Sequence, residues 1–125
     1  MKYTVRKREA ISIDLKVPNR TAYVYVDKEM GAKNISAGSA DIPVNSEIPY
    51  HFHDNEEKIM FINRGNGELV IEGETFPLEP ETMVFVPPRL KHQFKNTGIE
   101  TLSFAFFYSP AGPEQSLRKL AGKHE

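Results

Sequence analysis

Short runs of β-branched and aromatic residues follow one another along this chain, and proline, glycine or asparagine closes each run within a few residues. Runs of this length and spacing are typical of an all-β sandwich or barrel. Two glycine-containing turns, Gly65-Asn66-Gly67 and Glu72-Gly73, predict two successive hairpins. Nine strands are predicted: Ile11–Leu15, Ala22–Val26, Ser36–Ile42, Ile48–Phe52, Lys58–Asn63, Glu68–Ile71, Thr82–Val86, Gln93–Lys95 and Thr101–Tyr108.

Only the C-terminal tail has the pattern of a helix. Pro113 stands at its first turn, and Leu117 and Leu120 fall on one face. We interpret it as a surface helix that packs its leucines against the strands.

Length and composition predict one globular domain over residues 1–125, and they exclude several partners and sites. The net charge of -1 gives no electrostatic reason to expect nucleic acid or an anionic membrane as a partner. The chain has no cysteine, so any metal site must use nitrogen and oxygen ligands. No apolar run approaches the 18 residues of a membrane span, and the basic N-terminus lacks the apolar stretch of a secretory signal. We therefore expect a cytoplasmic protein.

Three of the four histidines stand in two short clusters. His51 lies in the predicted strand Ile48–Phe52 and His53 directly follows it; residues two apart on a strand point to the same face. His92 follows a proline-rich turn that ends another strand, and Glu57 comes four residues after His53. Three imidazole nitrogens and one carboxylate oxygen leave one or two positions open on a divalent first-row metal. The sequence predicts one such ion, which is Fe, Mn, Ni, Cu, Co or Zn.

These residues resemble the two motifs of the cupins, a family of small double-stranded β-helix (jelly-roll) barrels. The first motif, Gly-x5-His-x-His-x3,4-Glu-x6-Gly, is matched at Asn45, His51, His53, Glu57 and Gly65. The second, Gly-x5-Pro-x-Gly-x2-His-x3-Asn, is matched at Glu81, Pro87, Arg89, His92 and Asn96. The resemblance implies a jelly-roll barrel, here with a short C-terminal helix, that forms a homodimer and holds its metal with His51, His53, Glu57 and His92.

Three motif glycines are replaced in this chain. Asparagine tolerates the left-handed backbone region best after glycine, so the turn at Asn45 is expected to keep that conformation. Glu81 and Arg89 lack this tolerance, and we expect ordinary φ angles at both.

The spacing after the first motif leaves the register of the next strand open. Seven residues rather than six separate Glu57 from Gly65, and a slip of one residue exchanges the two faces of a strand. If Lys58 points inward, Met60 and Ile62 do too. If Glu57 points inward in an unbroken strand, its companions are Ile59, Phe61 and Asn63; a bulge after Glu57 is the third possibility.

Energetics favour Glu57 over Lys58 as the metal ligand. Lysine must lose a proton to bind a metal, at a cost of roughly 4–5 kcal/mol at pH 7, whereas a carboxylate is already ionised. A three-histidine site in which Glu57 is loosely bound or absent is the alternative. Near a metal, Lys58 could instead serve as a base or as an anchor for the substrate, since a nearby cation lowers its pKa.

The predicted site indicates a metal-dependent enzyme that acts on a small organic molecule. We place oxygen-dependent cleavage or oxidation ahead of isomerase or lyase chemistry, and a non-catalytic module that binds a small sugar or acid is the alternative. Tyr50 and Lys58 are the candidates for moving protons. Aromatic residues in alternating strands more often form plain core than a cavity wall. The expected lining of the substrate cavity is Phe52, Met60, Phe85, Phe94, Phe104 and Phe106.

Overall fold

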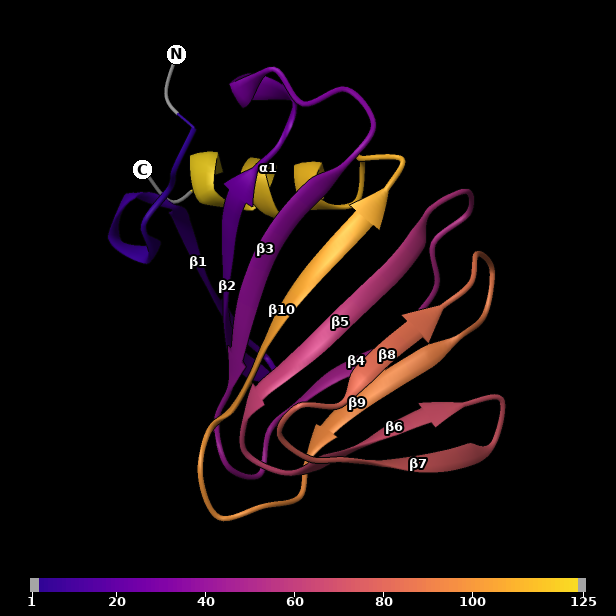
Figure 1. Cartoon of the computed structure of the whole chain (residues 1–125). Helices are drawn as coiled ribbons and strands as arrows, with labels where there is room; N and C mark the ends of the chain where they lie inside the picture. The colour runs from indigo at the N-terminus through magenta and orange to yellow at the C-terminus, as the bar shows by residue number, and fades with distance from the viewer. Residues whose placement is uncertain (1–2, 124–125) are drawn as a thin grey trace.

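Two antiparallel sheets face each other in the computed structural model, which describes residues 3–123 (Figure 1). One sheet has six strands, in the order β1 (Ile11–Lys16), β2 (Asn19–Val26), β3 (Ser36–Ile42), β10 (Leu102–Ser109), β5 (Glu57–Arg64) and β8 (Met83–Val86). The other has four, in the order β4 (Glu47–His51), β9 (His92–Asn96), β6 (Gly67–Ile71) and β7 (Glu74–Leu78). Two 3-10 turns, η1 (Lys7–Glu9) and η2 (Lys28–Met30), and the helix α1 (Glu114–Lys123) complete the fold.

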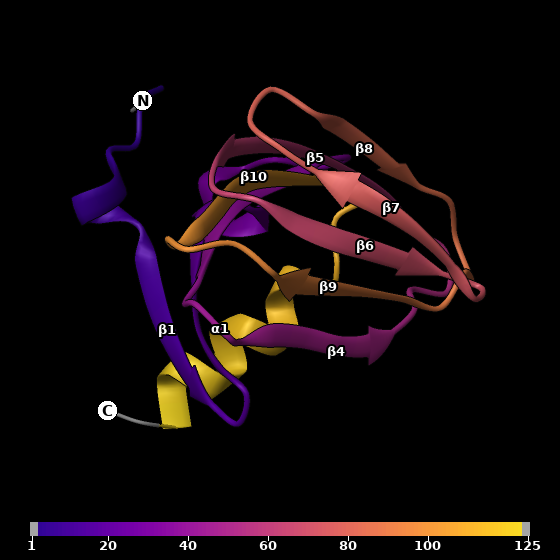
Figure 2. The ribbon, with the colours of Figure 1, turned by 90° about the horizontal axis from the view of Figure 1, so that it is seen from below.

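The core lies between the inner faces of the two sheets (Figure 2). Alternate residues of β3, β5 and β10 are buried, as expected where one face of a strand packs and the other meets solvent. Phe94 from the smaller sheet packs against Phe104 from the larger one, with ring centroids 5.8 Å apart. The predicted all-β jelly roll with a short C-terminal helix is therefore confirmed.

The nine predicted strands are all present, with ends that differ by up to three residues, and the prediction missed β7. Pro77 lies inside β7, and proline argues against a strand in the middle of a sheet. Because β7 pairs only with β6, it is an edge strand, where proline is tolerated.

One of the two predicted hairpins is wrong. Glu72 and Gly73 have positive φ and join β6 to β7 in a two-residue hairpin turn. The turn at Gly65 instead carries the chain from β5 in one sheet to β6 in the other. A Cβ atom on Gly65 would lie 2.5 Å from the Thr101 carbonyl oxygen, so this crossing requires glycine.

The turns at the replaced motif glycines all keep a left-handed backbone. Asn45 has a φ of 65°, as predicted, but Glu81 (68°) and Arg89 (65°) have it as well, so the expectation of ordinary φ angles there was wrong. Long-range bonds fix these two turns: Glu81 N–H donates to the Ile62 carbonyl (2.8 Å) and Arg89 N–H to the His53 carbonyl (2.7 Å). The fold keeps the turn at a local cost of roughly 1–2 kcal/mol per residue.

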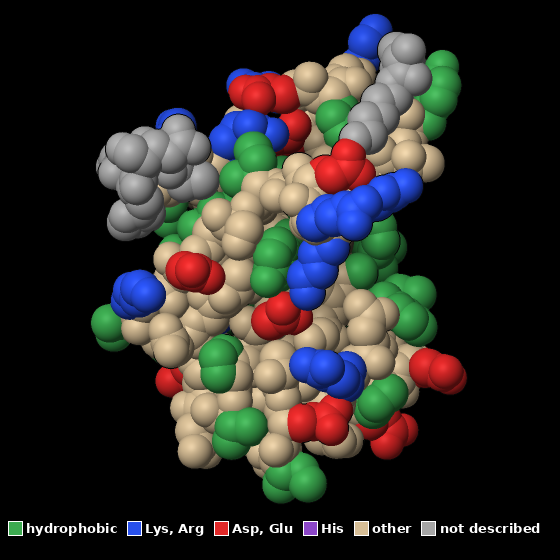
Figure 3. Space-filling model, turned by 90° about the vertical axis from the view of Figure 1, so that its left-hand side faces the viewer, with side chains coloured by type: hydrophobic (Ala, Val, Ile, Leu, Met, Phe, Trp, Pro, Cys, Tyr) green, Lys and Arg blue, Asp and Glu red, His purple; other side chains and the backbone are tan. Residues whose placement is uncertain are grey.

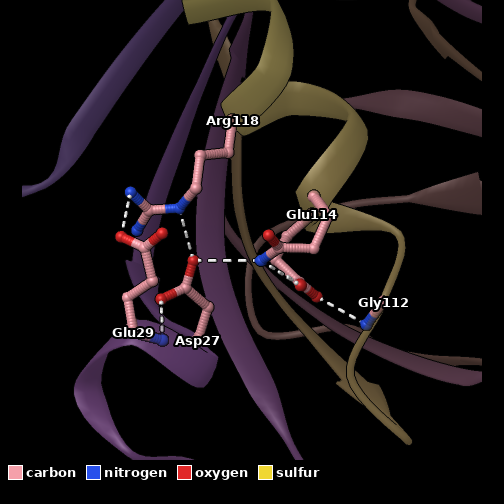
Figure 4. A network of polar contacts seen from close by, with 6 residues as sticks. Asp27, Glu29, Gly112, Glu114 and Arg118 are labelled. Atoms are coloured by element: carbon pink, nitrogen blue, oxygen red, sulfur yellow. Dashed lines mark hydrogen bonds and ion pairs between the residues drawn. The ribbon is translucent and has the colours of Figure 1, made fainter. Parts of the chain in front are cut away.

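A buried polar network fixes α1 against the end of β2 (Figure 4). The carboxylate of Asp27, 1% exposed, accepts from Arg118 Nε (2.7 Å), Gln115 Nε2 (3.2 Å) and the Glu29 N–H (3.1 Å). Arg118 Nη1 also lies 2.8 Å from Glu29 Oε2. Burial alone would raise the pKa of Asp27, but these hydrogen bonds and the charge of Arg118 hold it below its usual value.

We expect Arg118→Met to lower the free energy of unfolding at pH 7 by about 3 kcal/mol, because it leaves Asp27 buried without its cation. The contribution of Asp27 is present above its unfolded pKa and is lost as pH falls through its lower folded pKa, so the difference between variant and parent should shrink in acid. Urea unfolding across this pH range measures the effect. Arg64→Met is the matched control, since Arg64 is 60% exposed; equal losses in both variants would contradict the role given to Arg118.

The outer surface shows no single-sign field on the side where β1 lies. Basic and acidic side chains are intermixed there (Figure 3). Within residues 3–123, no helix has the length and apolar character needed to cross a membrane.

Candidate metal site and cavity

Three imidazoles converge at one end of the smaller sheet. His51 ends β4 and pairs with His92, the first residue of β9, while His53 lies just beyond β4. The ring centroids of His51 and His92 are 4.2 Å apart. The ring centroid of His53 lies 5.0 Å from that of His51 and 5.7 Å from that of His92. One ring nitrogen of each residue lies within 4.8 Å of the others. The predicted meeting of the three histidines is therefore present.

The route by which His53 reaches the other two differs from the prediction. We expected His53 to point to the same face as His51 because residues alternate along a strand, but β4 ends at His51. Instead, the hydrogen bond from Arg89 N–H to the His53 carbonyl ties this loop to the turn that leads into His92. The left-handed turn at Arg89 thus helps to bring the two clusters together.

Backbone carbonyls orient two of the rings. His51 Nδ1 lies 2.8 Å from the Pro49 carbonyl oxygen, and His92 Nδ1 lies 2.8 Å from that of Leu90. A carbonyl oxygen only accepts, so each Nδ1 carries the proton and each Nε2 keeps a free lone pair. This is the arrangement found around imidazoles that bind metals.

The site fits a divalent metal ion. The Nε2 atoms of His53 and His92 are buried and have no hydrogen-bond partner, a condition that costs free energy unless something binds them. Burial, with a contribution from the charge of Lys58, lowers the pKa of His51 and His53 to about 4. Burial also lowers the pKa of His92, to about 3. All three rings are neutral at pH 7 and therefore ready to bind a metal.

The structure differs from the expectation at Glu57, which is exposed on the outer face of β5. Lys58, 3% exposed, points inward together with Met60 and Ile62. The cost of deprotonating Lys58 concerns a single residue, whereas the burial of Met60 and Ile62 fixes the register of the whole strand and places Lys58 on the same face. Among the described residues no carboxylate joins the three histidines, so the set lacks the carboxylate of the facial triad in non-haem iron oxygenases.

Lys58 lies among aromatic rings near the histidines. Its Nζ is 5.1 Å from the ring centroid of Phe94, 5.3 Å from that of Tyr108 and 5.7 Å from that of Phe106. Burial lowers its pKa to about 7, so charged and neutral forms coexist near neutral pH.

A cavity of about 450 Å³ opens beside Lys58, His51 and His53, a volume within the range of small-molecule sites. Of the predicted lining, Phe52, Phe104 and Phe106 contribute to it, and so does Tyr50, which is 51% exposed. Three other predicted residues do not line it: Met60 and Phe94 are fully buried in the core, and Phe85, 55% exposed, lies on the outer face of β8.

Sequence reasoning missed two parts of the cavity wall. The helix α1 supplies Ser116 and Leu117, and Pro113 directly before it also lines the cavity, although the helix was interpreted only as a surface helix. Arg20 on β2 is the second. Arg20, Ala22 and Val24 are two residues apart and therefore share one face of the strand. A charged residue on the same face as two apolar ones was the signal that could have revealed it.

A family model described as Cupin domain matches residues 38–108. The polyketide synthase protein CurC of Streptomyces cyaneus is 32% identical over 88 residues, which are 70% of this chain and 57% of that protein. The structure of a predicted oxalate decarboxylase from Thermotoga maritima superposes with a TM-score of 0.79 at 22% identity, over 87% of this chain and all of that one. The polyketide cyclase RemF of Streptomyces resistomycificus gives 0.78 at 22% identity, over 90% and 82% of the two chains. With more than half of its residues matched, together with the jelly roll and its histidine cluster, this chain belongs to the cupin family.

Proposed function

We propose that this protein is a metal-dependent enzyme that transfers protons on a small organic molecule containing a carbonyl group. One observation carries the proposal: the unpartnered Nε2 atom of His53 and the buried Lys58 border one aromatic cavity, and the unpartnered Nε2 atom of His92 belongs to the same histidine cluster. Free imidazole nitrogens and a buried lysine with a lowered pKa, gathered at a cavity, mark a candidate functional site.

His51, His53 and His92 would hold one divalent ion. Bound by three neutral ligands, such an ion keeps its full charge and acts as a Lewis acid on a carbonyl oxygen. Oxygen-dependent oxidation was the first expectation, but a ligand set without a carboxylate and the presence of Lys58 favour isomerase or lyase chemistry instead.

Lys58 would take a proton from the substrate and return it. A group with a pKa near the working pH is best suited to both steps, and the pKa of Lys58 is about 7. Burial, with the nearby Glu114 and Glu56, raises the pKa of Tyr108, which therefore stays a neutral phenol. Tyr50, the other predicted proton carrier, is half exposed, which suits a position at the cavity edge.

The names of the relatives support a cyclic or aromatic substrate. A polyketide synthase protein and a polyketide cyclase are among the proteins similar to this one. The aromatic side chains of Phe52, Phe106 and Tyr108 along the cavity suit the same kind of molecule.

Phenylpyruvate in deuterated water tests the proposal, because removal and return of its methylene proton replaces hydrogen with deuterium. We expect the metal-loaded protein to accelerate the exchange by about 100-fold or more and Lys58→Met to abolish the acceleration without loss of metal. Proton NMR follows the exchange. Equal rates with the parent and with Lys58→Met would overturn the role of Lys58, and binding without exchange would favour the non-catalytic module.

The homodimer and the cytoplasmic location stay predictions. Ile59, Met83 and Phe85 are 42%, 63% and 55% exposed on neighbouring strands of the outer face, and exposed hydrophobic side chains of this kind support an interface between protein chains.

A further inference from the structure

A second cation stands in the cavity at a position where the fold calls for an apolar side chain. Arg20 precedes Ala22 and Val24 on β2, and these two are buried on the inner face. Its partner across the strand pair is Leu15, which also lines the cavity. Arginine is seldom placed on an inner face unless something pairs with its charge.

Residues 3–123, which the structure describes, supply no anion for Arg20. Its Nη1 donates to the Pro18 carbonyl oxygen at 2.8 Å, and that carbonyl is uncharged. None of the ion pairs within the described part of the chain involves Arg20. Burial lowers its pKa, yet a guanidinium stays charged at any physiological pH. Arg20 is therefore a cation at the border of an apolar cavity, and no carboxylate of the described part of the chain forms an ion pair with it.

Arg20 is also within electrostatic range of the metal site. Its charge contributes to lowering the pKa of His51, after burial and the charge of Lys58. Both Arg20 and His51 line the same cavity. One molecule inside the cavity can thus meet both the reacting end, with Lys58 and the histidines, and the guanidinium.

We propose that Arg20 binds a carboxylate of the substrate, so that the substrate is an aromatic or cyclic carboxylic acid that also contains a carbonyl group. This inference rests on the proposed function for the reacting end only. A guanidinium has five N–H donors in a planar fork that matches a carboxylate, and the bond to Pro18 uses one nitrogen and holds the group in place. Fixing the fork in advance lowers the entropy lost on binding.

A merely structural role is the competing explanation. Arg20 could serve only to brace the turn at Pro18, and its side chain could cover apolar surface. That role predicts equal effects of an Arg20 variant on charged and uncharged ligands, whereas an anion-binding role predicts an effect on the charged one alone.

Binding of 2-naphthoate and of the uncharged 2-naphthamide to the full chain separates the two roles, with ligand-observed NMR as the readout. The parent should bind the carboxylate more tightly. Arg20→Gln should weaken naphthoate binding by about 10- to 100-fold, as loss of a charged hydrogen-bonded pair does, and leave naphthamide within about twofold. Arg20→Lys keeps the charge without the fork and should give an intermediate value. Arg64→Gln, at an exposed arginine outside this cavity, is the matched control and should change neither.

Measurements on both metal-free and zinc-loaded protein keep this inference apart from the proposed function. If the preference for naphthoate in the metal-free protein depends on Arg20, the inference stands even where zinc uptake or proton exchange fails. Equal weakening of both probes by Arg20→Gln, or no change in either, would overturn it. A third probe in the same binding experiment is 2-naphthyl phosphate. Tighter binding of the phosphate than of naphthoate would also overturn the assignment to a carboxylate.

Discussion

Lys58→Met should raise the free energy of unfolding of the metal-free protein at pH 7 by about 4 kcal/mol, because each unit of pKa shift corresponds to about 1.4 kcal/mol. Burial lowers the pKa of Lys58 from 10.5 to about 7, so folding works against the protonation that the unfolded chain keeps. Methionine has a similar length and no charge, and it suits a position among Phe94, Phe106 and Tyr108.

The lowered pKa of Lys58 also makes the stability of the parent protein depend on pH. Between pH 7 and pH 10.5 the unfolded chain binds more protons at Lys58 than the folded one, so the stability of the parent should rise with pH across this window. Lys58→Met should lack this rise. The titratable groups that face Lys58 are the three histidines and Tyr108, which are all uncharged at pH 7 and offer no compensating anion.

Urea unfolding of both proteins at several pH values, with a chelator present, measures the difference. Lys95→Met on the exposed face of β9 is the control and should change stability by less than about 0.5 kcal/mol. A loss of stability in Lys58→Met would mean that the ammonium is stabilised where it lies. A gain in stability together with a loss of proton exchange would show that the position is kept for chemistry rather than for folding.

The strands and the histidine cluster were predictable because local patterns encode them. Strand alternation repeats every two residues, so a segment such as Ser36–Ile42 was placed with its correct ends. The spacing of His51, His53 and His92 matched a known pair of motifs, and the three rings do meet. Even so, His53 arrives through a loop tied to Arg89, a detail that no periodicity contains.

The features that sequence reasoning left open or placed wrongly depend on distant contacts. Lys58 faces inward because the register of β5 follows the burial of Met60 and Ile62 between the sheets. Glu81 adopts a left-handed turn because its N–H bonds to Ile62 across the fold. Local preferences predict the facing or the backbone conformation of a residue from its type alone, and at these two positions tertiary contacts override the preference.

The cavity wall shows the same limit. Arg20 on β2 and the residues of α1 lie nearly a hundred positions apart in the sequence, yet they line the same cavity. The buried network around Asp27 holds the helix in place there (Figure 4). Each has an ordinary local explanation, as a surface helix or as a turn residue. Their common function becomes visible only once the sheets are assembled.

His92→Ala should abolish the response of the protein to zinc. An ion that binds only the folded state stabilises it by about 4 kcal/mol when its free concentration is 1,000 times the dissociation constant. The parent should therefore melt at a clearly higher temperature with zinc than with a chelator. His92→Ala removes one of three ligands and a fully buried ring, so the shift should vanish along with bound zinc in elemental analysis.

Two comparisons make this result specific to the metal site. His124→Ala removes the remaining histidine of the sequence, which lies outside the described residues, and should leave the zinc response intact. Glu57→Gln should also leave it intact, because Glu57 is exposed on the opposite face of its strand from Lys58. A zinc response that survives in His92→Ala but disappears in Glu57→Gln would contradict the three-histidine site and restore the carboxylate ligand expected from the motif. Survival in all three variants would place the metal elsewhere, and the role of Lys58 as a proton carrier beside a metal would fall with it.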